Sequence, residues 1–211
     1  MPKALSFAFL LVLAPASLAA QQAADTLDYV VLRGADTVAT ERVWRDDVTF
    51  RGELTVRGLL NRLTQWSVVL GPDGAAALVE ANETEAPNDP RMKARVLHRT
   101  RVIFKADSAS LDDATGKGML TNIYPTKTGA VPYLNLSAGT LEVAVRKGLV
   151  GGEVPLFNLG GAQTVVATVT KTGEGSATLQ VGSITYQVTY DTEGRLVEAT
   201  LPAQQLRMMR R

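Results

Sequence analysis

The single histidine is the first residue in this sequence that could take part in chemistry. His98 lies among the arginines of the segment from Arg95 to Arg101, and the chain contains no cysteine. A zinc site at His98 would therefore have to recruit distant carboxylates, so an ordinary strand residue is the better interpretation. We predict no metal site and no cofactor.

Motifs for hydrolysis or calcium binding do not occur either. No Gly-x-Ser-x-Gly elbow exposes a serine nucleophile, and neither Asp107-Ser108-Ala109 nor Asp191-Thr192-Glu193-Gly194 matches an aspartic peptidase motif. The paired carboxylates Asp46-Asp47 and Asp112-Asp113 lack the spaced aspartates and glycine of a calcium loop. We predict no catalytic residues and a protein that is not an enzyme, with an uncharacterised hydrolase kept as the second alternative.

An apolar cavity is the remaining kind of site that the residues suggest. Nearly all of the larger aromatic side chains fall on predicted strands or beside the predicted helix, and most of them should be core. A curved sheet wrapped around one helix can nevertheless leave an apolar cleft that admits a lipid-like ligand. The candidates for lining such a cleft are Trp66, Phe104, Tyr133, Leu141, Val145, Tyr186 and Val188.

The charge balance argues against a nucleic-acid partner. The chain has 22 basic and 21 acidic residues, and loss of Lys3 with a leader peptide would make the two equal, so no general attraction to nucleic acid results. We expect an uncharged or apolar partner, either a lipid or other apolar small molecule or a protein of the cell envelope. The basic tail around Arg207, Arg210 and Arg211 could touch an anionic membrane, but it is more typical of a frayed terminus, so any membrane contact should be peripheral.

Residues 1–20 have the pattern of a secretory signal peptide. Lys3 supplies the positive start, Ala4 to Leu13 the apolar segment, and Ser17-Leu18-Ala19 the small residues of a cleavage site. No cysteine follows to which a lipid could be attached. We therefore predict cleavage near residue 20, a single β-rich domain over residues 21–211, and export to the periplasm of a two-membrane bacterium.

The mature segment is organised around the stretch from Ser176 to Pro202. Between Ile184 and Tyr190 apolar and polar residues alternate, which predicts a strand with one apolar face, and the turn residues on either side predict an antiparallel meander of three strands. Similar runs predict further strands at 27–33, 38–45, 48–56, 63–70, 75–81, 95–104, 154–159 and 164–170.

One helix is predicted, from Ala138 to about Leu149. Ser137 suits the N-cap position, and Leu141, Val145 and Leu149 recur at the spacing of one helix face. Three segments lack a clear strand pattern: 83–90 is predicted as an exposed loop, 107–118 is polar and rich in glycine, and 119–131 is irregular. The predicted fold is mainly β, a curved antiparallel sheet or open half-barrel of about ten strands with one helix packed on its concave face.

This layout resembles that of bacterial periplasmic clam-fold proteins, the class that includes the lipoprotein carriers LolA and LolB. The likeness consists of an export signal, strand meanders, one helix in mid-chain and the closing hairpin from Asp191 through Gly194-Arg195-Leu196 to Leu201-Pro202. The lipid-anchor cysteine of LolB is missing here, and the hairpin also resembles uncharacterised exported families. The resemblance implies an open, curved sheet that holds a hydrophobic ligand.

These observations favour an exported, non-enzymatic protein that shields an apolar ligand or a lipidated partner between sheet and helix. The alternative is a structural or interaction module of the cell envelope with a fully packed core. The two differ in whether apolar surface remains open to a ligand inside the molecule.

Overall fold

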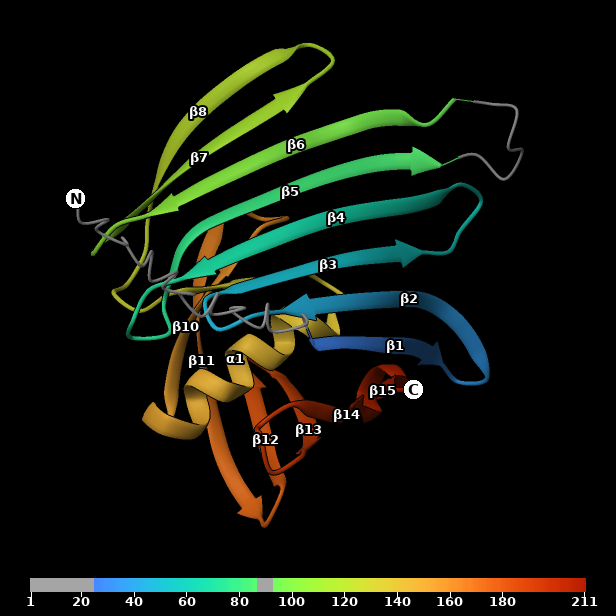
Figure 1. The fold of residues 1–211 in the computed structure, drawn as a ribbon, viewed down its shortest axis with the longest axis vertical. Helices are drawn as coiled ribbons and strands as arrows, with labels where there is room; N and C mark the ends of the chain where they lie inside the picture. The colour runs from blue at the N-terminus through green and yellow to red at the C-terminus, as the bar shows by residue number, and fades with distance from the viewer. Residues whose placement is uncertain (1–24, 87–92) are drawn as a thin grey trace, which may run out of the picture.

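The computed structural model describes residues 25–86 and 93–211. The predicted signal peptide and residues 87–92 of the predicted loop lie outside the described residues. Within them the chain forms fifteen strands, one α-helix and one short 3₁₀ helix (Figure 1). The strands belong to a single sheet.

The elements follow one another along the chain with short connections. The strands of the first part are β1 (Asp25–Arg33), β2 (Asp36–Arg45), β3 (Thr49–Val56), β4 (Asn61–Leu70), β5 (Ala76–Ala86), β6 (Arg95–Phe104), β7 (Ser108–Thr115), β8 (Gly118–Pro125) and β9 (Val131–Tyr133). The helix α1 (Ala138–Gly151) is followed by β10 (Glu153–Asn158), β11 (Gln163–Gly173), β12 (Ser176–Val181), β13 (Ile184–Tyr190), β14 (Leu196–Leu201), the 3₁₀ helix η1 (Pro202–Gln204) and β15 (Leu206–Arg210).

Strand β1 joins two meanders into one sheet. Strands β1 to β8 are neighbours in sequence order, while β15 to β9 follow on the other side of β1 in reverse order. The described strands pair antiparallel except β9 and β10, which are parallel. In Figure 1 the strands β1 to β8 run across the upper part, whereas β10 to β12 descend steeply below them.

The predicted mainly β fold with an open, curved sheet and one helix is confirmed, but the expected number of about ten strands is wrong. The structure adds β7 and β8, which fall in the segments that gave no strand prediction. Nearly every residue of β8 is exposed, because it is an edge strand, so no face alternates in its sequence. It also adds β9, which has only three residues, and β5 continues to Ala86 through part of the predicted loop.

The basic C-terminal tail is also a strand rather than a frayed end. β15 pairs with β1 through Tyr29↔Arg210 to Arg33↔Leu206, and with β14 on its other side. Leu206 and Met208 are buried. The C-terminal tail is therefore a strand inside the sheet, between β1 and β14.

The meander predicted around Ser176 to Pro202 is present as β12, β13 and β14. In β13 Tyr186 and Val188 are buried, and the residues between them, Thr185, Gln187 and Thr189, are exposed. The alternation in the sequence thus specified both the strand and its faces.

The predicted helix is confirmed, with its N-cap and an end two residues further on. The Ser137 side chain accepts a hydrogen bond from the Thr140 N–H at 3.1 Å, as an N-cap residue should. The helix contacts β9, β10, β11 and β14 on one side and β2 and β3 on the other. It therefore fills the angle between the two halves of the sheet and completes the core.

Substitutions on β13 test this register. Val188→Asp places an unpaired carboxylate at a site that is 1% exposed, which should cost about 5 kcal/mol, comparable with the whole stability of a domain. Thr189→Asp lies on the exposed face and should cost about 1 kcal/mol or less. Chemical denaturation of both variants checks this, and equal damage would mean that both faces of β13 are buried.

Candidate functional site

A buried carboxylate lies at the N-terminus of α1. Glu41 on β2 is 2% exposed, and its oxygens accept hydrogen bonds from Ser137 Oγ at 2.6 Å and from the Gly139 N–H at 3.0 Å. Trp66 on β4 donates its Nε1–H to the same carboxylate at 2.9 Å. A negative charge here satisfies free N–H groups of the first turn and complements the helix dipole. Glu41 therefore fastens the start of α1 to the sheet.

The helix approaches the sheet closely at this point because Gly139 has no side chain. A Cβ on Gly139 would lie 2.6 Å from the Trp66 ring and 2.8 Å from Val43. Gly52 serves the same purpose on β3, where the Trp66 indole lies directly against it. The two glycines and the indole thus fix the distance between α1 and strands β2 to β4.

A second buried carboxylate fixes the helix one turn further along. Glu142 is 1% exposed and accepts hydrogen bonds from Tyr29 Oη and the Leu196 N–H, both at 3.0 Å. Arg45 donates to its other oxygen at 2.9 Å. Glu142 thus ties α1 to β1, β2 and β14, which belong to both halves of the sheet.

Burial dominates the titration of both carboxyl groups. Desolvation raises the pKa of Glu41 above its usual range, even though the hydrogen bonds from Ser137, Gly139 and Trp66 oppose it. Desolvation also raises the pKa of Glu142, against the opposing effects of the Leu196 N–H and the Arg45 guanidinium. The same desolvation, together with the Glu142 charge, raises the pKa of Tyr29.

A groove with a volume of about 890 Å³ opens beside the other face of α1. Val143, Arg146, Lys147 and Val150 line it from the helix, at the spacing of one helix face. The opposite wall comes from the ends of β2, β3 and β4 and from the β2–β3 and β4–β5 turns. We call this space the helix groove, and its apolar lining consists of Val48, Phe50, Leu70, Val143 and Val150.

Two of these apolar residues are open to solvent: Val48 is 56% exposed and Val150 is 92% exposed. Phe50 is buried under the guanidinium of Arg146, which lies 5.7 Å from the ring centroid. The helix groove thus combines a covered aromatic floor with an exposed aliphatic rim. Such a mixture is common where a ligand buries an apolar group.

Ion pairs close one side of the helix groove. Arg45 contacts Asp25 at 3.0 Å as well as Glu142, and Arg195 contacts the same aspartate at 2.9 Å. Glu193 contacts both arginines. Ten of the seventeen residues that line the helix groove are charged, so its apolar residues lie within a largely charged lining.

The seven residues predicted to line a cavity lie mainly in the core. Leu141, Val145, Tyr186 and Val188 are at most 3% exposed. Tyr133 is half-buried, and its hydroxyl lies 2.9 Å from that of Tyr186, so the structure brings these two together. Phe104 is half-buried and meets Phe157 edge to face at 5.5 Å.

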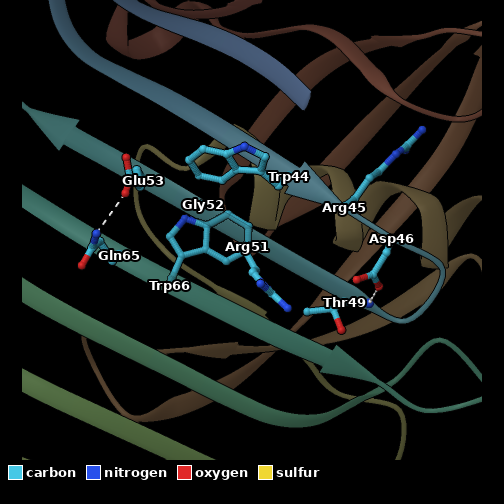
Figure 2. Close-up of a pocket in the computed structure, with 9 residues that line it drawn as sticks. All are labelled: Trp44, Arg45, Asp46, Thr49, Arg51, Gly52, Glu53, Gln65 and Trp66. Atoms are coloured by element: carbon cyan, nitrogen blue, oxygen red, sulfur yellow. Dashed lines mark hydrogen bonds between the residues drawn. The ribbon is translucent and has the colours of Figure 1, made fainter. Parts of the chain in front are cut away.

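Trp66 is the member of this set that lines grooves, although its side chain is buried. One groove of about 440 Å³ crosses β2, β3 and β4 (Figure 2). Its other lining includes Trp44, Arg51 and Glu53, and Gln65 donates to Glu53 at 2.9 Å. Trp44, Arg51, Glu53 and Gln65 alternate along their strands with residues that face α1, so these four side chains lie on the opposite side of the sheet. Arg45 also lines this groove, although its guanidinium reaches Glu142 of α1.

Sequence reasoning missed the residues of the helix groove. The helix face that lines the groove carries Val143, Arg146, Lys147 and Val150, so it mixes valine with basic residues. This face is offset from the one that Leu141, Val145 and Leu149 mark. Val150, which is followed by two glycines, and Val48, which follows Asp47 in a turn, were signals of exposed apolar residues. The sequence alone did not indicate that Val48 and Val150 line the same groove.

The described residues contain no group of three or more histidine, aspartate or glutamate side chains that could hold a metal ion. His98 faces Asp113 of the neighbouring strand, with Nδ1 3.3 Å from Oδ1 at an exposed position. None of the helices in residues 25–86 and 93–211 is both long and apolar enough to cross a membrane.

The raised pKa of Glu41 gives a dependence of stability on pH. The folded state holds this proton to higher pH than the unfolded chain, whose pKa is about 4.3, so the stability from Glu41 is complete below that pH and is lost as pH rises through the folded pKa. Glu41→Gln cannot titrate. The free energy of unfolding of the wild type minus that of the variant should therefore fall as pH rises from about 4, by up to about 1.4 kcal/mol per pH unit.

Urea unfolding of both proteins across this pH range measures the difference. Thr40→Ala, on the other face of β2, is the control and should give a difference from wild type that does not vary with pH. A difference that grows with pH for Glu41→Gln would contradict the burial argument.

Comparison with known proteins gives a likeness of fold. No protein-family model matches the chain, and no curated protein matches it. Among solved structures, a DUF1089 family protein from Pseudomonas aeruginosa superimposes with a TM-score of 0.57 at 13% sequence identity, over 80% of this chain and 91% of that one. At this identity the chain is similar to that protein in its fold alone.

Proposed function

We propose that this chain is an exported, non-enzymatic protein that binds the apolar part of a small molecule or of a lipidated partner in the helix groove. The observation that carries the proposal is the groove itself, about 890 Å³ of open space between α1 and the ends of β2 to β4 with their turns. Pockets of about 300 to 1,000 Å³ are typical of small-molecule sites.

The exposed aliphatic rim supports an apolar occupant. Val48 and Val150 are turned to solvent at 56% and 92% exposure, and burying both under a ligand would be favourable. Each would contribute about 1 kcal/mol at roughly 25 cal/mol per Å² of apolar surface removed from water. Phe50 and Leu70 also line the groove.

The fixed position of α1 supports a site that exists before the ligand arrives. Glu41 and Glu142 tie the helix to three strands through buried hydrogen bonds, as described above. A groove held open by such contacts needs little reorganisation on binding, which favours affinity. Export to the periplasm remains part of the proposal and is supported by the residues of the leader segment.

A structural or interaction module is the second candidate, and one observation favours it. Leu141, Val145, Tyr186 and Val188 are buried, so the interior that was expected to hold a ligand is packed at these four residues. Under this alternative the helix groove is a surface depression with no ligand, and the molecule presents its outer surfaces to other proteins.

Binding of the uncharged apolar dye N-phenyl-1-naphthylamine distinguishes the two candidates. We expect the wild-type protein to enhance its fluorescence saturably. The double variant Val48→Asp with Val150→Asp should weaken the dye affinity about tenfold or more, because both sites lose apolar contact and become charged. Both residues are exposed, so the fold should remain intact.

Ile123→Asp is the matched control, because Ile123 is 73% exposed on β8, away from α1. It should bind the dye like the wild type. Equal loss in both variants, or no saturable binding by the wild type, would overturn the groove as a ligand site and favour the packed module.

A further inference from the structure

Two exposed leucines form the tip of the hairpin between β3 and β4. Leu59 is 99% exposed and Leu60 is 48% exposed, and both follow Gly58 in the turn. Single exposed apolar residues are ordinary, but two adjacent exposed leucines at the end of a long hairpin form a small apolar surface.

This tip lies at the opposite end of the sheet from the helix groove. Because β1 to β6 pair antiparallel in sequence order, the β1–β2, β3–β4 and β5–β6 connections share one end, and the β2–β3 and β4–β5 turns that line the groove share the other. Figure 1 shows the β1–β2 and β3–β4 turns together on the right. The hairpin of β7 and β8 lies beyond β6, at the top of Figure 1.

Positive charge surrounds the leucines. Arg33, Arg57 and Lys93 are exposed at this end and have no carboxylate partner within the described residues. Asp36, at the start of β2, is an exposed carboxylate at the same end. We call Leu59, Leu60, Arg33, Arg57 and Lys93 the docking tip.

Two further arginines add to this charge although they are paired. Arg62 contacts Glu83 at 3.2 Å and Arg95 contacts Glu85 at 2.8 Å. The side chains of the arginines are 61% and 72% exposed, whereas those of the glutamates are 28% and 20% exposed. Among the described residues at this end, five exposed cationic side chains therefore lie beside the exposed Asp36 and the less exposed Glu83 and Glu85.

We infer that the docking tip binds the surface of an anionic lipid bilayer. Leucine side chains enter the boundary between headgroups and acyl chains, and arginine and lysine beside them pair with lipid phosphates. A second copy of this chain is a poorer occupant, since its own docking tip would bring like charges together. This inference goes beyond the proposed ligand site and uses none of its residues.

Co-sedimentation with vesicles tests the inference. Vesicles of phosphatidylcholine with about a quarter phosphatidylglycerol should carry the protein down at low ionic strength, and about 1 M salt should release it because the Debye length then falls to about 3 Å. Vesicles of phosphatidylcholine alone should bind it much less. All proteins are compared in the same processed form, so residues 1–24 contribute equally to each.

Two sets of variants separate the contributions of the docking tip. Arg57→Gln with Lys93→Gln should reduce the partition coefficient about fivefold for each charge removed. Leu59→Ser with Leu60→Ser should reduce it about tenfold and leave the salt dependence unchanged. These residues are exposed, and unchanged unfolding midpoints will show that the fold is intact.

Ile123→Ser is the matched control, because Ile123 is 73% exposed on β8 and belongs neither to the docking tip nor to the helix groove. It should bind vesicles like the wild type. Equal binding to neutral and anionic vesicles, or full binding by both sets of variants, would overturn the inference. Self-association that these variants abolish would replace the bilayer with a second copy as the occupant.

Discussion

The carboxylate of Glu41 at the N-terminus of α1 is the interaction on which the rest of the structure depends. It links three elements that are distant in sequence, because Ser137 and Gly139 belong to the helix, Trp66 to β4 and Glu41 itself to β2. Burying a carboxylate is costly unless donors surround it, and here the donors come from the elements that must meet. Glu142 repeats this arrangement one turn later and extends it to β1 and β14.

The position of the helix determines where the molecule has open surface. One face of α1, with Leu141 and Val145, is buried against the sheet, while the face with Val143 and Val150 borders the helix groove. Gly139 and Gly148 allow close approach, since a Cβ on either would collide with a neighbouring side chain. Because this face of the helix is packed closely against the sheet, the open space lies beside the helix rather than beneath it.

Much of the fold was readable from the sequence, and the reasons differ by element. Alternation between Ile184 and Tyr190 specified a strand because one face is buried, and Ser137 marked the helix start because capping is local. β8 and β15 were missed, since an edge strand has no buried face and the pairing of the C-terminal tail depends on β1, far away in the chain. The helix groove was missed for a similar reason, because Val48 and Val150 come to line one groove only in the folded chain. The predicted cavity residues were chosen because they are apolar, and apolar residues occur in a packed core as readily as in a binding site.

The central claim is that the space beside α1 holds an apolar molecule in the cell. The most direct measurement is native mass spectrometry of the protein purified from exporting cells without detergent, followed by organic extraction and identification of what is released. We predict a bound species of additional mass that is extracted into organic solvent and is lost from the Val48→Asp, Val150→Asp protein. A bare polypeptide mass for the wild type, with an empty extract, would contradict the claim.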